Sequence, residues 1–292
     1  MHLLGCHISI AGGFDKALCR AETLGCTALQ FFTHSPSAWA MKPLASANTE
    51  AFRTALASSP IRDAVVHTMY LLNLASPDPD LFARSIGALG EECSRAVSLG
   101  IHSIVTHVGA HRGNGVAWGI DRIRAALDHL RKTKFWQEND CRLMLENTSG
   151  AGTTLGATWE QMSLILAGFP SDRFGVCLDT CHAHAAGYDL SSPRGVQAML
   201  DSIGRLFGLH RLMLVHLNDS VFPAGSHRDR HEHIGCGEIG PVGMAAILNH
   251  PVLSELPVIL ETPKERVDGI EGDLRNLQRV RQLCMAEEPF SP

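Results

Sequence analysis

The sequence predicts an α/β fold, a single (β/α)8 TIM barrel spanning residues 1–292 as one domain. Three observations support this. Apolar runs alternate with segments whose apolar residues recur at helical spacing. The ends of these runs recur about every 25 to 45 residues, a normal βα repeat length. The runs show little alternation, as expected for parallel strands covered by helices. An open doubly wound sheet is the alternative, but it would spread the strand ends along a line.

Eight apolar runs are expected as strands. The first two cover residues 3–10 and 27–32. Each of the other six stops at a side chain that can bind a metal. In chain order these strands end at His67, His107, Glu146, Asp179, His216 and Glu261. Carboxyl ends of barrel strands meet at one face, so the six side chains are expected to gather there.

Helical segments follow the strands. The first covers residues 14–24, where apolar residues recur at helical spacing until Gly25 stops the helix. The third is introduced by Asp78 and Pro79 and ends before Gly100. A long polar loop is expected over residues 218–240. The third helix continues over residues 81–99, and the other helices are expected at residues 46–58, 118–134, 159–166, 193–206, 242–248 and 271–285.

Composition indicates a globular cytosolic protein, because 45% of residues are hydrophobic and 19% are charged. No apolar segment approaches the roughly 18 residues of a membrane span, and the amino terminus lacks signal-peptide character. We therefore expect cytoplasmic localisation, in the bacterial cytosol at the nucleoid, with no membrane partner. The nine cysteines form no C-x-x-C pair and are expected to be buried, reduced thiols.

Nine histidines and carboxylates form a candidate metal cluster at the C-terminal ends of the strands. A lone buried histidine is usually a hydrogen-bonded core residue, and a lone carboxylate at a strand end often caps the next helix. Six such strand ends together favour metal binding instead. Imidazoles and carboxylates without thiolate suit zinc, with manganese as the alternative. Nine ligands suffice for two or three ions. The candidates are His67, His107, Glu146, Asp179, His182, His216, Asp229, His231 and Glu261.

Clustered metals suit phosphodiester hydrolysis, because they supply hydroxide at neutral pH and stabilise charge on the phosphate. No G-x-S-x-G, Walker loop or dinucleotide fingerprint offers another chemistry. The net charge of −5 argues against a generally basic nucleic-acid surface. Three divalent cations would more than cancel that charge.

Several motifs resemble those of the endonuclease IV family, and the resemblance spans nearly the whole chain. They include G-C-H-I-S-I-A-G-G at residues 5–13, L-E-N-T-S-G-A-G at 145–152, V-C-L-D-T-C-H-A-H-A-A-G-Y-D at 176–189 and D-R-H-E-H-I-G-C-G-E-I-G at 229–240. The segments V-H-T-M-Y-L-L-N-L-A-S-P at 66–77, H-L-N-D-S at 216–220 and L-E-T-P at 260–263 complete the set. The resemblance implies a monomeric barrel with three Zn²⁺ ions that acts on abasic sites in duplex DNA.

The resemblance also implies a role for each ligand. His67, His107 and Glu146 would hold the first ion. Glu146 would bridge to a second ion, also held by Asp179, His216 and Glu261. The carboxylates Glu146, Asp179 and Glu261 would be the catalytic residues. The third ion would be held by His182, Asp229 and His231. The implied reaction is hydrolysis 5′ to the abasic site, leaving a 3′-hydroxyl and a 5′-deoxyribose phosphate, with removal of blocked 3′ ends.

DNA contacts are implied at loops over the barrel mouth, where the abasic nucleotide would be flipped out. Tyr70 and Leu71 match residues that press into the base stack. The other implied contacts are His7, Gly12, Gly13, Arg112, Arg228 and Arg230. Three positions depart from the family pattern, with Ser37 for an arginine, Ala151 for a glutamine, and His227 followed by Arg228 where the family has G-S-R-x-D-R-H. They bear on DNA affinity and lesion preference more than on hydrolysis.

Two other functions remain open on the sequence. Sugar isomerases and epimerases share this barrel and a Glu-Asp-His-Glu metal site, for which Glu146, Asp179, His216 and Glu261 would suffice. Such an enzyme has no need of the other five ligands. A non-catalytic protein that binds damaged DNA is the third hypothesis, and the complete ligand set argues against it.

Overall fold

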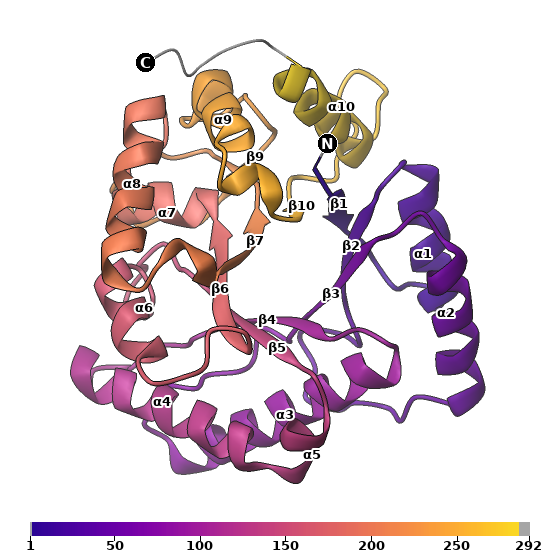
Figure 1. Ribbon diagram of the computed structural model, residues 1–292, viewed down its shortest axis with the longest axis vertical. Helices are drawn as coiled ribbons and strands as arrows, with labels where there is room; N and C mark the ends of the chain where they lie inside the picture. Colours follow the sequence, from indigo (N-terminus) through magenta and orange to yellow (C-terminus); the bar gives the residue numbers. More distant parts are fainter. Residues whose placement is uncertain (1, 286–292) are drawn as a thin grey trace.

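Eight parallel strands hydrogen-bond in the order β1-β10-β7-β6-β5-β4-β3-β2 and close into a barrel, with helices around its outside (Figure 1). The computed structural model describes residues 2–285. The predicted (β/α)8 barrel is therefore confirmed, and the open doubly wound sheet is wrong. The barrel strands are β1 (Leu4–His7), β2 (Ala28–Phe32), β3 (Asp63–His67), β4 (Ser103–His107), β5 (Arg142–Glu146), β6 (Phe174–Asp179), β7 (Leu212–His216) and β10 (Val258–Leu260).

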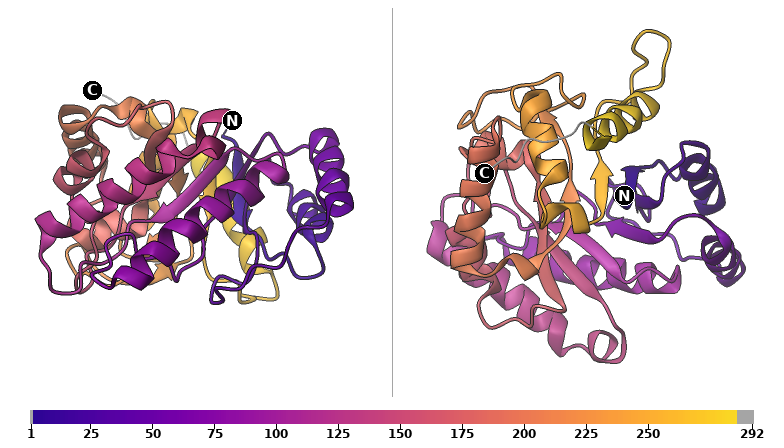
Figure 2. Two further views of the ribbon diagram at one scale, coloured as in Figure 1. Left: turned by 90° about the horizontal axis from the view of Figure 1, so that it is seen from below. Right: turned by 45° about the horizontal axis from the view of Figure 1, so that its top comes forward.

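Ten α-helices surround the barrel within the described residues, and α3 and α4 lie side by side along one face (Figure 2). None of these helices is long and apolar enough to cross a membrane. The helices are α1 (Phe14–Thr23), α2 (Ser46–Ser58), α3 (Pro79–Ser98), α4 (Val116–Lys132), α5 (Lys134–Glu138), α6 (Trp159–Leu166), α7 (Thr180–Ala186), α8 (Pro193–Leu206), α9 (Gly240–Asn249) and α10 (Gly272–Met285).

Side-chain caps explain where several helices begin. The Asp78 carboxylate accepts hydrogen bonds from the backbone N–H groups of Asp80 and Leu81 at the start of α3. Ser192 caps α8 in the same way, and a proline follows each cap, where its missing N–H costs nothing. Thr133 caps α5, so the helix predicted over residues 118–134 ends as α4 at Lys132 and a separate short helix follows it.

Three local features differ from the prediction. Strand β1 ends at His7, because the chain turns at Ile10, whose carbonyl accepts from Gly13. Strand β10 ends at Leu260, because the N–H of Glu261 donates to the Asn218 side chain instead of to a strand. The polar loop over residues 218–240 contains an antiparallel hairpin of β8 (Asp219–Ser220) and β9 (His231–Glu232).

The hydrophobic core has two parts. The larger part lies between the barrel and its helices, and all strands contribute to it. The smaller part fills the barrel interior as an apolar plug, with one residue from each of seven strands. The plug consists of Ala28, Val65, Val105, Met144, Cys177, Leu214 and Ile259. It gives the barrel a dry floor beneath its C-terminal mouth.

Candidate metal centre at the barrel mouth

Seven polar side chains form a layer directly above the plug, each two residues beyond a plug residue along the chain; six lie on the same strand as that residue and Glu261 lies just past β10. Because side chains alternate along a strand, a residue two positions further faces the same way. These residues therefore point to the barrel axis at the C-terminal mouth. This mouth layer consists of Gln30, His67, His107, Glu146, Asp179, His216 and Glu261.

Glu146 lies at the centre of the mouth layer, only 1% exposed. Its Oε2 lies 3.0 Å from His67 Nε2 and 3.1 Å from His107 Nε2. Its Oε1 lies 3.3 Å from His216 Nδ1, and that nitrogen is 3.3 Å from Glu261 Oε2. One buried carboxylate thus joins two ligand groups, each compact enough to hold a metal ion. The groups are His67, His107, Glu146 and Glu146, Asp179, His216, Glu261.

A third group combines His182 on α7 with Asp229 and His231 from the long loop. His182 Nε2 lies 3.1 Å from Asp229 Oδ2. His231 Nε2 lies 3.6 Å from both Asp229 Oδ1 and Asp179 Oδ2. It is buried and has no hydrogen-bond partner among the described residues. A buried ring nitrogen aimed between two carboxylates fits a metal ligand better than a packed core histidine.

The imidazoles are held in orientation by bonds on their outer nitrogens. His67 Nδ1 donates to the Thr68 carbonyl, His182 Nδ1 to that of Asn147, and His231 Nδ1 to that of Glu261, at 2.7 to 3.0 Å. Carbonyl oxygens only accept, so each ring carries a proton on Nδ1 and turns its Nε2 toward the carboxylates. Such outer bonds are typical of metal-binding histidines.

Gln30 is the functional residue that the sequence analysis missed. It is fully buried, its Oε1 accepts from His216 Nε2 at 2.9 Å, and its Nε2 donates to Glu261 Oε1 at 2.8 Å. It therefore leaves His216 Nδ1 free to face the carboxylates. The sequence did contain one indication of its role. Gln30 lies two residues after the plug residue Ala28, the same spacing that separates each mouth-layer ligand from its plug residue.

Asp179 caps a helix and also faces the candidate metal ligands. Its Oδ1 accepts the N–H of His182 and caps α7, a seven-residue helix that was not predicted. Its Oδ2 accepts from the Asn218 amide and faces His231. Capping thus turns the first residues of α7 into a frame that places His182 beside Asp179.

The charges in the cluster shift one another's pKa values. Burial alone would raise the pKa of Glu146, but the imidazoles of His107 and His216 hold it well below its usual range. Burial alone would lower the pKa of His107 and His182, but Glu146 raises the first, and Asp179 and Asp229 raise the second well above its usual range. The buried carboxylates therefore require positive charge beside them.

Two cysteines lie close to the ligands but remain neutral thiols. Burial raises the pKa of Cys177 and of Cys181 to about 12. The thiol of Cys181 donates to the Arg230 carbonyl at 3.6 Å. All nine cysteines are free, as predicted, but only six are buried; Cys19 and Cys236 are exposed, against the prediction.

Tyr70 stands at the rim of the mouth. Its side chain is 59% exposed, and its ring lies 6.2 Å from His67 and 6.1 Å from His107. Phe32 supports it edge-on at 5.0 Å. Burial of the hydroxyl and the nearby Glu261 raise the pKa of Tyr70 to about 12. Leu71 is only partly exposed and packs against the core.

The other residues with predicted DNA contacts lie around the same mouth. His7 Nδ1 is 3.1 Å from Glu261 Oε1, so His7 contacts one of the candidate ligands. Gly12 and Gly13 are exposed in the β1–α1 loop. The arginines Arg112, Arg228 and Arg230 are exposed on loops, and the Arg228 guanidinium lies over Phe222.

The three departures from the family pattern all lie in loops. Ser37 and Ala151 are exposed. His227 has a left-handed backbone (φ 53°) and donates from Nδ1 to the Ser149 carbonyl at 2.9 Å. It thereby links the loop after β7 to the loop after β5.

Two buried charged residues of α3 hold the loops after β2 and after β3, and the second of these loops carries Tyr70. Glu92 accepts from Thr33 Oγ1, His34 Nε2 and the N–H of Met69. Arg95 donates to Thr33 and to the Lys42 carbonyl. The loops after β2 and after β3 are thus fixed to the same helix.

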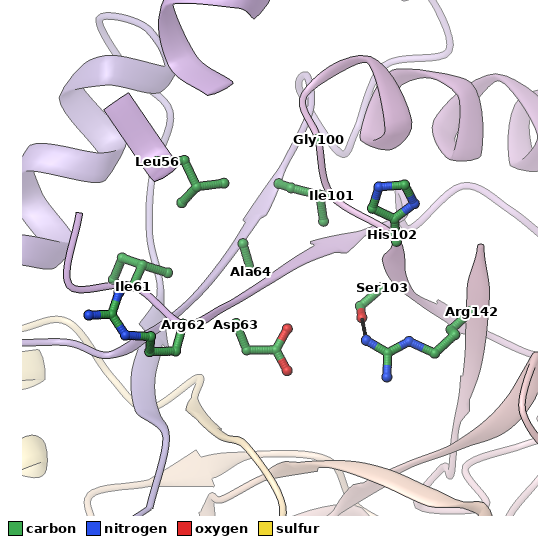
Figure 3. A pocket seen from close by; sticks show the side chains of 10 residues that line it. All are labelled: Leu56, Ile61, Arg62, Asp63, Ala64, Gly100, Ile101, His102, Ser103 and Arg142. Carbon is green, nitrogen blue, oxygen red and sulfur yellow. Dashed lines mark hydrogen bonds between the residues drawn. The ribbon is translucent and has the colours of Figure 1, made fainter. Parts of the chain in front are cut away.

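A pocket of about 200 Å³ lies at the end of the barrel opposite the mouth layer, where β3, β4 and β5 begin (Figure 3). Arg142 donates to Ser103 there, and Asp63 faces it with a pKa that burial raises. Barrel enzymes carry their active sites at the other face, so we assign this pocket a structural role.

The comparisons with known proteins agree with this geometry. A family model described as a xylose isomerase-like TIM barrel matches residues 18–282. A probable endonuclease 4 of Methanoculleus marisnigri is 45% identical over 98% of this chain and 100% of its own length. One of Trichlorobacter lovleyi is 41% identical over 96% and 99%. The chain belongs to the endonuclease IV family.

Solved structures place the family within a wider group of barrels. The endonuclease IV of Thermus thermophilus superimposes with a TM-score of 0.84 at 35% identity, covering 96% of this chain and 98% of that one. A D-tagatose 3-epimerase-like protein superimposes at 0.74 with 17% identity, covering 97% of each chain, which shows a shared fold alone. Endonuclease IV, and not an epimerase, is therefore the relevant comparison.

The shifted pKa values predict that zinc stabilises this endonuclease IV chain more as the pH rises. In the metal-free protein, obtained with a chelator, the pKa values of His107, His182 and His216 are raised above 6.5. Protonation of these histidines therefore stabilises the metal-free fold below pH 6.5, and this stabilisation is lost as the pH rises through their raised pKa values. Zinc instead requires neutral imidazoles. The difference in Tm between zinc-loaded and chelated protein should therefore widen from pH 6.5 to 8. A constant difference across that range would contradict this electrostatic description.

Proposed function

We propose that this protein is a DNA repair endonuclease that hydrolyses the phosphodiester 5′ to an abasic site in duplex DNA. The products would be a 3′-hydroxyl and a 5′-deoxyribose phosphate, and the same site would remove blocked 3′ ends. One observation carries the proposal. Nine imidazoles and carboxylates form three neighbouring groups at the barrel mouth, two of which share Glu146, and these are more ligands than an isomerase needs. Family membership supplies the substrate class.

The donors fit three divalent ions, with zinc favoured by the mixture of imidazole and carboxylate. His67, His107 and Glu146 would hold the first. Glu146, Asp179, His216 and Glu261 would hold the second, and His182, Asp229 and His231 the third. Such ions supply hydroxide at neutral pH and stabilise negative charge on an attacked phosphate. No serine or cysteine nucleophile is then required.

The chain's own residues would orient both reactants. Glu261 is the most exposed carboxylate of the mouth layer, with 18% of its side chain accessible, and Gln30 and His7 fix its Oε1. It is therefore well placed to face the entering phosphate. Tyr70 stands at the rim, where an aromatic ring can fill the gap left by a flipped nucleotide. Flipping costs a few kcal/mol and costs least at an abasic site, which favours that lesion. We expect a monomer to suffice.

Incision of a labelled duplex with one reduced abasic analogue tests the proposal, because this analogue resists β-elimination. The parent should cut once, on the 5′ side, and leave a 3′ end that a polymerase extends. Mutation of a residue that only hydrogen-bonds to a metal ligand typically lowers activity by roughly 10- to 100-fold. Glu261→Gln should lower kcat by more than this, because Glu261 is a proposed ligand itself. Glu265→Gln, the same change at an exposed position, should cut like the parent. A metal-loaded parent that leaves the duplex intact would refute the proposal.

Tyr70→Ala tests the proposed recognition of the lesion. Losing one stacking ring should raise KM for the abasic duplex about tenfold, since stacking on an aromatic ring is worth about 1–3 kcal/mol. Hydrolysis of bis(p-nitrophenyl) phosphate should be unchanged, since that substrate has no base stack. Tyr70→Phe keeps the ring and should match the parent. An unchanged KM in Tyr70→Ala would exclude a wedge role.

A further inference from the structure

Asp219 is a buried carboxylate that is not among the candidate ligands. It follows Asn218 at the end of β7 and is 0% exposed. Its Oδ1 accepts from the backbone N–H groups of Ser220 at 2.8 Å and Ile239 at 3.0 Å. Its Oδ2 accepts from those of Gly235 and Gly237, both at 3.0 Å. The N–H of Gly240 lies 3.2 to 3.3 Å from both oxygens.

These bonds close the loop that carries two candidate ligands. The five donors come from both ends of residues 220–240, so one side chain fixes where the loop leaves β7 and where it enters α9. The positive amino end of α9 also favours a carboxylate there. Asp219 and Ser220 pair with Glu232 and His231 in the β8–β9 hairpin. Asp229 lies two residues before His231.

The glycines of this loop are matched to the carboxylate. A Cβ on Gly237 would lie 2.3 Å from the Ser220 carbonyl oxygen and 2.6 Å from Asp219 Oδ1. No other residue fits there without moving the backbone. Gly235 has φ +77° and Gly240 has φ +68°, which glycine adopts readily. The sequence G-C-G-E-I-G thus lets the chain wrap closely around one side chain.

The third ligand group depends on this loop more than the other two groups do. His67, His107, Glu146, His216 and Asp179 are fixed on barrel strands. Asp229 is half-exposed, and apart from its contacts with His182 and His231 it is positioned by its loop. His231 is oriented by its bond to the Glu261 carbonyl, which requires the hairpin to lie over β10.

We propose that Asp219 is a positioning residue that presents Asp229 and His231 together to a divalent metal ion at the third group. The proposal rests on the proposed function, because it assumes that this group binds metal. The carboxylate acts through the backbone and does not touch the ligand atoms. Its removal should therefore weaken one ion selectively and leave the two barrel-held ions in place.

Asp219→Asn is the sharpest test, because asparagine has nearly the same shape with one acceptor oxygen instead of two. An amide nitrogen can only donate. If the amide nitrogen takes the place of Oδ2, it faces the N–H groups of Gly235 and Gly237. If it takes the place of Oδ1, it faces those of Ser220 and Ile239. In either orientation at least two backbone N–H groups lose their acceptor. Asp189→Asn is the matched control. It removes the same charge from a loop whose Asp189 accepts from Ser191 and which carries no candidate ligand.

The first readout is zinc per folded chain after dialysis against a weak chelator. We expect about three ions for the parent and for Asp189→Asn, and about two for Asp219→Asn. The second readout is rescue. Incision by Asp219→Asn should recover when zinc is raised about 10- to 100-fold, the range by which outer metal partners change affinity. The parent should not respond.

The outcomes separate the two proposals. Three retained ions in Asp219→Asn would overturn the positioning role, and so would lost activity that zinc does not restore. Fewer than three ions in the parent would instead refute the three-ion centre, and the inference with it. Gly237→Ala strains the same contact without changing charge, and it should lose the same ion. It replaces Asp219→Asn if that variant does not fold, and three retained ions there would equally overturn the role.

Discussion

The structure depends on a buried excess of negative charge at the mouth of the barrel. Glu146 and Asp179 are almost completely buried, and Glu261 is largely buried beside them. Carboxylates removed from water cost several kcal/mol each unless positive charge lies against them. The imidazoles around them balance these charges only when they are protonated, as the raised pKa values of His107, His182 and His216 indicate. Divalent cations would balance them, and the loops that complete the ligand groups can be understood as adaptations to that requirement.

Strand alternation provides this arrangement with few residues. The plug residue Met144 and the ligand Glu146 are two positions apart, as are Cys177 and Asp179, and Leu214 and His216. A dry floor and a polar layer therefore alternate along the same strands. The apolar plug excludes water from beneath the ligands, which strengthens every electrostatic interaction above it.

The sequence predicted the barrel and the gathering of strand-end ligands well, because both follow from local patterns. Hydrophobic runs reveal strands, and parallel strands bring their carboxyl ends together. It did not predict α7, because its seven residues carry too little periodicity and the helix depends on the Asp179 cap. Gln30 was missed because glutamine is not a usual metal ligand and its partners lie on β7 and just past β10. The fold around Asp219 was missed because four of its five donors lie 16 to 21 positions further along the chain, where no local sequence pattern reveals them.

The candidate ligands divide into a strand-held set and a loop-held set. Glu146, Asp179, His216 and Glu261 belong to the barrel, whereas His182, Asp229 and His231 depend on a short helix and a hairpin. The central claim is that both sets hold metal at once. The most direct measurement is an anomalous difference map, collected at the zinc edge, from zinc-loaded crystals. Three peaks, one within each ligand group and two of them sharing Glu146, are expected. A single peak among the four barrel-held ligands would contradict the account.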